Sequence, residues 1–238
     1  MGSTISTGEE YLEAIRARES DRNARRAFQS TVMKVAGPGS HLFDFGAGPG
    51  MDAKFYAGKG LQVAAYDIEP RMCAAFRRHC AEEIASGQVQ LFECGYREFL
   101  ERQIPEIRAR CAIDVVTANF APLSLIDDLH ELFAGLHALT RPGALILASV
   151  LNPQFFGDWR YGWWWANRLR YWRDGHFSVR GEDFNVYRRS YENFASLAQP
   201  YFTLRATIRG LPDNTAPSSS GRLALLTSRY TFLLFARR

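Results

Sequence analysis

Hydrophobic residues along the first two thirds of the chain form short apolar runs, and segments with a helical repeat separate these runs. The apolar runs predict strands at His41–Phe45, Leu61–Tyr66, Val89–Phe92, Ile113–Ala118 and Ala144–Val150. Apolar positions at helical spacing predict helices over Met51–Ala57, Arg71–Ala85, Arg97–Gln103 and Leu123–Leu139. Strands and helices that alternate in this way are typical of right-handed βαβ units, so we expect a doubly wound α/β fold.

The two ends of the chain have different patterns. Thr7 followed by Glu10 has the form of a capping box and predicts a first helix, and a second helix is expected over Asp21–Val35. Near the other end, Phe202–Arg209 and Thr227–Phe235 predict two more strands, separated by a loop rich in proline, serine and glycine. The sequence therefore predicts a Rossmann-like fold with a mostly parallel seven-stranded sheet and helices on both faces.

Composition places the chain among ordinary globular proteins. Hydrophobic residues make up 47% and charged residues 23%, which excludes a disordered or fibrous chain. The net charge of +4 comes from arginines spread along the chain, without the run of like charges that marks a nucleic-acid arm. No apolar run approaches the ~20 residues of a membrane helix, and the N-terminus has no apolar signal region, so we expect a cytoplasmic protein.

The cysteine pattern bears on metal binding and on redox state. Cys73, Cys80, Cys94 and Cys111 form no CxxC pair, and no histidines accompany them at zinc-finger spacing. We therefore expect reduced, mostly buried thiols and no metal site.

A glycine-rich turn follows the first strand of the core. Such a turn presents backbone N–H groups to a ligand, as in dinucleotide-binding folds, so a nicotinamide or flavin site is one interpretation. That fingerprint requires G-x-G-x-x-G, whereas the glycines here are Gly46, Gly48 and Gly50, and residue 51 is methionine. Asp44 would crowd a pyrophosphate but suits a ligand with a cationic amino group. Asp67 ends the second strand, where this topology places a carboxylate against ribose hydroxyls.

Four segments at strand ends together resemble the motifs of the class I S-adenosylmethionine-dependent methyltransferases. They are Leu42–Gly50 around the glycine turn, Tyr66–Met72 after the second strand, Glu93–Tyr96 after the third, and Ile113–Phe120 in the fourth. The resemblance extends from about Leu42 to Val150. It implies that the chain binds S-adenosylmethionine and releases S-adenosylhomocysteine.

The resemblance also implies a role for each matching residue. Asp44 and the backbone of the glycine turn would hold the methionine part of the cofactor, and Asp67 would bind its ribose. The other implied cofactor-binding positions are Gly46, Ala47 and Gly48 in the turn, Ile68 and Met72 flanking the adenine, Gly95 and Tyr96 along the adenine edge, and Asn119 and Phe120 beside the donor. Tyr96 departs from the family, which often has an acidic residue there that contacts the adenine amino group.

All five tryptophans lie in one short, arginine-rich stretch that follows Asn152 and Pro153. Trp165, Leu169 and Trp172 share one face of a predicted helix, so one interpretation is an amphipathic helix packed on the domain. A second interpretation is a lid over the carboxyl edge of the sheet, where open α/β folds bind ligands, and a third is a helix resting on lipid. The substrate-binding residues of such a lid would be the aromatic wall of Trp159, Trp163 and Trp164, with Arg160 meeting an anion.

These patterns divide one domain, residues 1–238, into four parts. We expect N-terminal helices over 1–40, a cofactor-binding core over 41–151, a substrate lid inserted over 152–185, and a C-terminal helix with the last strands over 186–238.

Catalysis of methyl transfer requires little from side chains. Displacement at a sulfonium methyl proceeds in line, so the enzyme contributes mainly by holding the acceptor near the methyl group and excluding water. A general base is optional. For a hydroxyl acceptor the first candidate is His176, since imidazole titrates near neutrality, followed by Asp158 and Tyr161.

The sequence predicts an enzyme that methylates a small molecule at oxygen, nitrogen or carbon. Residues 119–122, Asn-Phe-Ala-Pro, lack the Asn-Pro-Pro-aromatic pattern of methyltransferases that act on amide or exocyclic amino nitrogens of proteins and nucleic acids. This difference disfavours a nucleic-acid partner, although the basic pI of about 9.0 leaves an RNA methyltransferase as an alternative. A noncatalytic S-adenosylmethionine-binding protein is the other alternative, because a fold does not dictate a function. The acceptor and the oligomeric state stay open.

Overall fold

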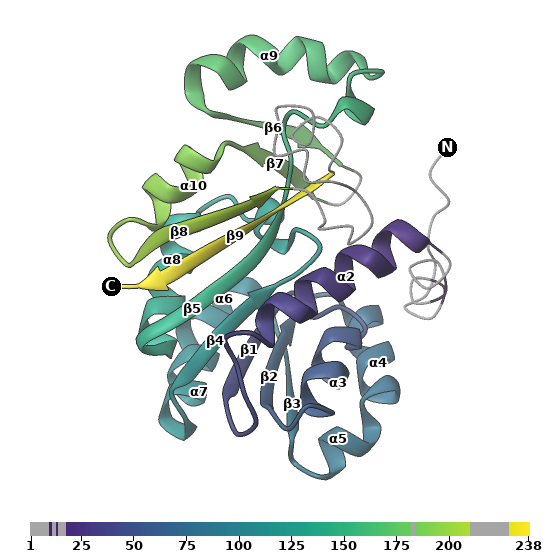
Figure 1. Ribbon diagram of the computed structural model, residues 1–238, viewed down its shortest axis with the longest axis vertical. Coiled ribbons are helices and arrows are strands. Elements are labelled where there is room, and N and C mark those ends of the chain that lie inside the picture. The colour runs from purple at the N-terminus through teal and green to yellow at the C-terminus, as the bar shows by residue number, and fades with distance from the viewer. Residues whose placement is uncertain (1–9, 11–12, 14–17, 182–183, 210–228) are drawn as a thin grey trace.

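A computed structural model describes residues 10, 13, 18–181, 184–209 and 229–238, and it contains a twisted sheet between two layers of helices (Figure 1). The strands of this sheet are β1 (His41–Phe45), β2 (Gln62–Asp67), β3 (Val89–Glu93), β4 (Ile113–Ala118), β5 (Thr140–Leu151), β8 (Phe202–Arg209) and β9 (Tyr230–Arg237). The helices are α2 (Glu19–Val32), α3 (Met51–Ala57), α4 (Pro70–His79), α5 (Ala81–Ala85), α6 (Tyr96–Glu98), α7 (Ile104–Arg110), α8 (Leu129–Leu139), α9 (Gly162–Asp174) and α10 (Tyr191–Ala198). None of the described helices is long and apolar enough to cross a membrane.

The strand order confirms the predicted fold. The seven strands lie in the order β3-β2-β1-β4-β5-β9-β8, with β1 to β5 parallel and β9 antiparallel to both of its neighbours. The chain winds outward from β1 through β2 to β3, and then returns to the other side of β1 as β4. In such sheets ligands bind beyond the carboxyl ends of the strands at the point where this order reverses, here between β1 and β4.

Two hydrophobic cores lie on opposite faces of the sheet. Strand β1 is buried on both faces, and its successive residues Leu42 and Phe43 belong to different cores because side chains alternate along a strand. Beneath α2 and α3 the core contains Phe28, whose ring meets Phe232 edge-on at 5.4 Å. On the other face Phe43 stacks on Phe99, with ring centroids 5.5 Å apart. Asp44 therefore stands in an otherwise apolar strand that solvent reaches on neither face.

Several helices differ from the sequence prediction. The single helix predicted over Arg71–Ala85 is two helices, because Cys80 leaves the helical conformation between α4 and α5. The helix predicted to begin at Leu123 starts instead as a 3₁₀ turn, and α8 begins after Asp128, whose side chain accepts a hydrogen bond from the Glu131 backbone N–H. The helix predicted at Thr7 and the loop rich in proline and serine lie outside the described residues.

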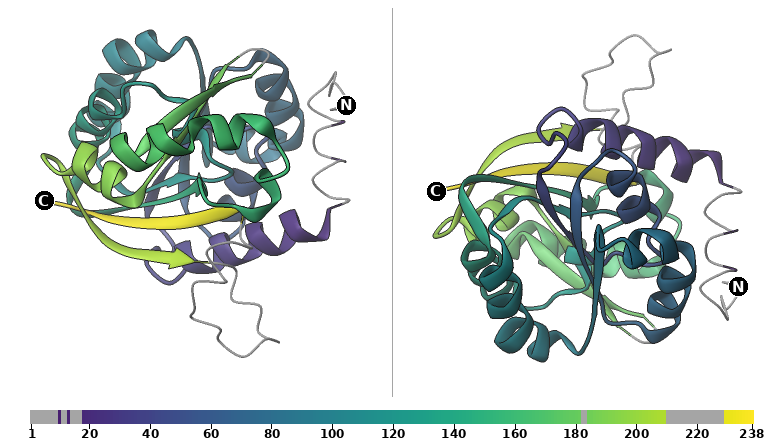
Figure 2. Two further views of the ribbon diagram at one scale, coloured as in Figure 1. Left: turned by 90° about the horizontal axis from the view of Figure 1, so that it is seen from above. Right: turned by 90° about the horizontal axis from the view of Figure 1, so that it is seen from below.

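The segment after β5 contains α9 and a hairpin that the sequence did not reveal. Helix α9 lies over the carboxyl edge of the sheet, as the view from above shows (Figure 2). It is followed by the two-stranded sheet of β6 (His176–Arg180) and β7 (Asn185–Arg189), which continues past the boundary expected at residue 185. Most residues of these two strands are exposed or half-buried. In β6 the alternation of polar and apolar residues, His-Phe-Ser-Val-Arg, is only five residues long, and β7 has no such alternation, so the pattern that predicts a strand is weak here.

The apolar face of α9 is largely exposed to solvent. Trp165, Leu169 and Trp172 are 54%, 80% and 88% exposed, so the interpretation that this face packs against the domain is wrong. The buried tryptophan is Trp164, whose indole N–H donates to the Pro153 carbonyl at 3.0 Å. Helical spacing alone did not indicate that Trp164 is the tryptophan that packs against the domain, because its burial depends on a contact with the turn after β5.

The third glycine of the turn gives a test of how α3 and α4 pack. Gly50 has a φ of 82°, and a Cβ there would lie 2.7 Å from the Cys80 sulfur and 2.8 Å from the Phe76 ring. Gly143 has a similar φ of 80° but open space around it. We expect Gly50→Ala to lower the free energy of unfolding by about 2–4 kcal/mol and Gly143→Ala by about 1 kcal/mol, as measured by urea denaturation. Equal losses of unfolding free energy in the two variants would show that α4 can move away from a Cβ at residue 50 without further loss of stability.

Candidate functional site

The glycine turn folds back over the end of β2. The N–H groups of Gly46 and Ala47 both donate to the Tyr66 carbonyl, at 2.9 and 3.0 Å. Gly46, Gly48 and Gly50 all have positive φ values, which residues with a side chain rarely adopt. A Cβ at Gly46 would also lie 2.5 Å from Pro122, so the turn contacts the segment after β4 too. These contacts place the turn at the switch point of the sheet.

Asp67 joins the turn to the end of β2. One carboxylate oxygen accepts from the Gly48 N–H at 2.7 Å, and the other accepts from the Glu69 N–H at 2.9 Å. Burial raises the pKa of this carboxyl, while those backbone hydrogen bonds oppose the shift. The carboxylate is thus fixed in direction before any ligand binds.

Asp44 is the most enclosed carboxyl of the site. Only 2% of its surface is exposed, and one oxygen accepts from the Thr117 hydroxyl at 2.7 Å. Its other oxygen has no hydrogen-bond partner among the described residues. Burial, followed by the nearby charge of Asp52, raises the pKa of Asp44 to about 7. A buried carboxyl with a free oxygen fits a ligand that brings a cationic N–H group to it.

A second buried carboxylate connects three elements around the pocket. Asp52, in the first turn of α3, forms an ion pair with Arg25 of α2. It also accepts from the side-chain amide of Gln29 at 2.8 Å and from that of Asn119 at 3.0 Å. The Arg25 guanidinium lies over the Phe120 ring, 4.6 Å from its centroid. The sequence did not single out Arg25, Gln29 or Asp52, because a charge on a helix resembles a solvated surface.

The backbone beyond β4 is strained. Phe120 and Ala121 have φ values of 61° and 67°, in the left-handed region that residues with a Cβ avoid. The Phe120 N–H donates to the Ser149 hydroxyl at 2.6 Å, and its ring meets Tyr230 edge-on at 5.6 Å. Strain of this kind concentrates at functional sites, where the surrounding structure maintains it.

These side chains surround one narrow pocket of about 30 Å³. Its lining contains six of the residues expected at the cofactor, namely Asp44, Gly46, Ala47, Gly48, Asn119 and Phe120, together with Arg25, Pro49 and Asp52. The structure thus brings together residues that are up to 95 positions apart in the sequence, from Arg25 to Phe120.

The remaining cofactor positions lie along the ends of β2 and β3. Ile68 is 46% exposed beside Asp67, and Met72 is half-buried in the first turn of α4. Gly95 is exposed before α6, and Tyr96 is half-buried with a hydroxyl that has no partner among the described residues. Burial raises the pKa of Tyr96. These residues form the edge of the site next to Asp67.

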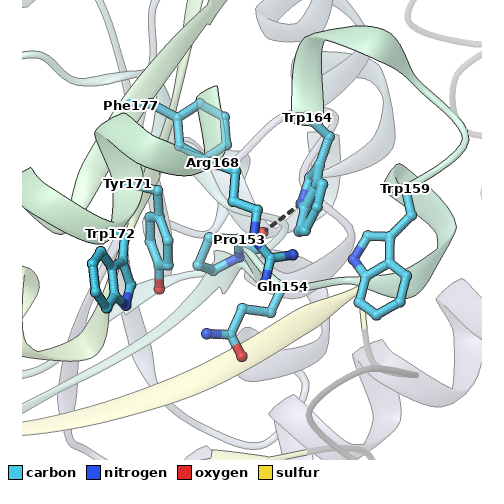
Figure 3. Close-up of a pocket in the computed structure, with 8 residues that line it drawn as sticks. All are labelled: Pro153, Gln154, Trp159, Trp164, Arg168, Tyr171, Trp172 and Phe177. Atoms are coloured by element: carbon cyan, nitrogen blue, oxygen red, sulfur yellow. Dashed lines mark hydrogen bonds between the residues drawn. The ribbon is translucent and has the colours of Figure 1, made fainter. Parts of the chain in front are cut away.

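The expected substrate residues divide into two groups. Trp159 and Trp164 line a separate pocket of about 260 Å³ beside α9 (Figure 3). Trp163 is not in that lining and stacks on Tyr161, with ring centroids 5.9 Å apart. Arg160 lies over the Tyr161 ring at 4.9 Å. The insertion therefore has two parts. One is a pocket lined by Trp159 and Trp164, and the other is the stack of the Trp163 and Tyr161 rings, which lies outside that lining.

The three candidate bases line neither of these two pockets. His176 is exposed at the start of β6, with its Nδ1 3.0 Å from the Asp174 carbonyl. Asp158 is buried and forms an ion pair with Arg188 at 2.9 Å. Tyr161 is 41% exposed. Asp158 braces the insertion through this ion pair.

Comparison with known proteins identifies the class to which this fold and site belong. A family model described as a methyltransferase domain matches residues 13–191 of the chain. The chain therefore belongs to the methyltransferase domain family, and it is a class I enzyme that uses S-adenosylmethionine.

A curated relative shares part of the sequence. A malonyl-[acyl-carrier protein] O-methyltransferase from Serratia marcescens is 30% identical over 125 residues, which make up 51% of this chain and 43% of that protein. The match thus spans less than half the length of the relative.

Solved structures with the same fold extend over nearly the whole chain. An S-adenosylmethionine-dependent methyltransferase from Mesorhizobium loti has a TM-score of 0.63 and 16% identity, covering 94% of this chain and 100% of that one. A 1,6-didemethyltoxoflavin-N1-methyltransferase from Burkholderia thailandensis, solved with 1,6-didemethyltoxoflavin and S-adenosylhomocysteine bound, has a TM-score of 0.58 and 18% identity. That match covers 100% of this chain and 93% of that one.

The raised pKa of Asp44 makes stability depend on pH. In the folded protein Asp44 keeps its proton up to about pH 7, whereas in the unfolded chain it ionises near pH 4. Its contribution is fully present below about pH 4 and is lost as the pH rises through about 7. We expect Asp44→Asn to show a smaller decline in the free energy of unfolding between about pH 4 and 7 than the unmodified protein. Asp128→Asn, at an exposed position, controls for the loss of one acidic group. Equal declines in all three proteins would contradict the raised pKa.

Proposed function

We propose that this methyltransferase transfers the methyl group to a small-molecule acceptor, at oxygen, nitrogen or carbon. The observation that carries the proposal is the position of the aromatic insertion, which covers the carboxyl edge of the sheet and leaves a lined pocket of only about 260 Å³. A pocket of that size suits a small molecule. The Burkholderia thailandensis neighbour, whose structure contains 1,6-didemethyltoxoflavin, supports this substrate class.

The residues at the switch point suit the cofactor. We assign Asp44, through its unpartnered oxygen, to the amino group of the methionine part, and the turn at Gly46–Gly48 to close backbone contact with that part. Asp67 is assigned to the ribose hydroxyls. Arg25 is the one cation in the described lining of this pocket, and it suits the methionine carboxylate.

The other cofactor assignments follow the edge of the sheet. Ile68 and Met72 flank the adenine, Gly95 and Tyr96 follow its edge, and Asn119 with Phe120 lies beside the reacting methyl group. The exposure of Ile68 agrees with an apolar surface that the adenine would cover. Tyr96 supplies a hydroxyl in place of a carboxylate at the adenine edge.

The chemistry requires alignment more than proton transfer. S-adenosylmethionine supplies a methyl group on a sulfonium, so a bond forms from the acceptor to the methyl carbon while the sulfur–carbon bond breaks and its electron pair stays on sulfur. Phe120, held by the Ser149 hydroxyl, fixes the wall beside the reacting atoms. The tryptophan-rich insertion excludes water as a lid. An acceptor with an acidic proton can release it to solvent, and His176 is an exposed group of the insertion that can take it.

A transfer assay tests the proposal. Protein is incubated with S-adenosylmethionine tritiated at the methyl group, together with separate pools of small metabolites and of RNA. We expect the label to enter the small-molecule pool only. Label in RNA, with binding that weakens steeply as salt increases, would replace the proposal with an RNA methyltransferase.

Asp67 gives a prediction for cofactor affinity. We expect Asp67→Ala to weaken the binding of S-adenosylhomocysteine by about 1–3 kcal/mol, measured by calorimetry, because charge-assisted hydrogen bonds to the ribose are lost. Asp128→Ala is the matched control, since it also removes a carboxylate that binds a backbone N–H, but at the start of α8. An unchanged dissociation constant in a folded Asp67→Ala variant would show that Asp67 does not hold the ribose.

A further inference from the structure

The pocket beside α9 has aromatic walls that come from several segments. Trp164, Tyr171 and Trp172 extend from α9, Phe177 from β6, and Trp159 from the turn before the helix. Tyr171 meets Phe177 edge-on, with ring centroids 6.0 Å apart, and Trp159 is tilted against Trp164 at 5.4 Å. Figure 3 shows Tyr171 and Trp172 on one side of the pocket and Trp164 and Trp159 on the other. Aromatic rings on two sides of the pocket favour a flat, apolar ligand between them.

Hydrogen-bond donors project between these walls. The Arg168 guanidinium lies 5.3 Å from the Trp164 ring centroid, and it forms no ion pair within the described part of the chain. The Trp159 indole nitrogen is shielded from solvent and has no acceptor among the described residues. In Figure 3 this nitrogen lies on the side of the ring that faces Arg168, and the Gln154 amide lies below them. A shielded N–H without an acceptor is costly unless a ligand supplies one.

We propose that this pocket binds the methyl acceptor, and that the acceptor is a planar aromatic molecule carrying a carboxylate. Its rings would stack between the tryptophan and tyrosine walls. Its carboxylate would accept from the Arg168 guanidinium, whose planar fork matches a carboxylate, and from the Trp159 N–H. The inference rests on the proposed function, since it names the class of small molecule.

The pocket lies near the strained end of β4. Its wall residue Pro153 follows Ser149 by four positions, and the Ser149 hydroxyl accepts from the Phe120 N–H at 2.6 Å. Pro153 follows the end of β5 and Phe120 follows the end of β4, and these two strands are parallel neighbours, so both residues lie at the carboxyl edge of the sheet. The pocket beside α9 and the proposed cofactor site therefore lie at the same edge.

Binding of matched probes tests this inference without relying on turnover. The full-length chain is saturated with S-adenosylhomocysteine and titrated in a calorimeter with 2-naphthoate or with 2-naphthamide, which has the same rings but no charge. We expect 2-naphthoate to bind at least tenfold more tightly, because the amide cannot form a charge-assisted pair with Arg168. Quenching of the tryptophan emission should accompany binding, since all five tryptophans lie between residues 159 and 172.

Variants at exposed positions identify the residues responsible. Arg168→Gln should weaken 2-naphthoate at least tenfold and leave 2-naphthamide within about twofold. Trp172→Ala, at a side chain that is 88% exposed, should weaken both probes without risk to the fold. Arg173→Gln is the matched control, because Arg173 lies on the same helix, is paired with Asp174 and does not line the pocket. It should change neither affinity.

Three results would overturn the inference. These are equal affinity for the two probes, an unchanged 2-naphthoate affinity in Arg168→Gln, or no binding of either probe while S-adenosylhomocysteine still binds. Each of these results would leave the proposed methyl transfer in place, with a different kind of small molecule as the acceptor. Failure of S-adenosylhomocysteine itself to bind would instead remove the proposed function. The second result, if accompanied by a loss of 2-naphthoate affinity in Arg160→Gln, would place the anion site outside the pocket.

Discussion

The buried ion pair between Arg25 and Asp52 is the interaction on which the geometry of the proposed cofactor site depends. It connects α2 to the first turn of α3, and the same carboxylate holds the Asn119 side chain at the end of β4. Both charges are almost fully removed from solvent, with 11% and 6% of their side chains exposed. Removing one partner from such a pair costs about 3–5 kcal/mol, because the remaining charge stays buried without compensation. The carboxylate of Asp52 thus connects α2, α3 and the end of β4 around the site.

Neighbouring carboxyls make this arrangement electrostatically demanding. The charge of Asp52 contributes to raising the pKa of Asp44, and a single arginine serves this cluster within the described pocket lining. The free protein responds by keeping a proton on Asp44. A ligand that brings a positive charge favours the ionised form, so the proposed contact with the cofactor amino group would link binding to proton release at this residue.

The core of the fold was predictable because β1, α3 and β4 have local patterns that agree with their tertiary environment. Their observed bounds, His41–Phe45, Met51–Ala57 and Ile113–Ala118, are those predicted from the sequence. The hairpin of β6 and β7 was not predicted, since the alternation of apolar residues covers only the five residues of β6 and is absent from β7. Six of the expected cofactor residues line one pocket because the parallel strands that carry them end at one edge. Arg25 could not, because only tertiary packing shows that this arginine of α2 faces a buried carboxylate.

The strained pair Phe120 and Ala121 has a consequence for how this protein can evolve or be engineered. Each non-glycine residue in the left-handed region costs about 1–2 kcal/mol, so the free protein gives up stability at the point where we propose that the acceptor and the cofactor meet. Glycine in place of Ala121 would recover part of that loss but would also allow the adjoining Phe120 to change its backbone direction. Selection for thermal robustness and selection for turnover therefore act in opposite directions at this position. A stabilised variant of this enzyme should draw its gains from surfaces distant from the end of β4.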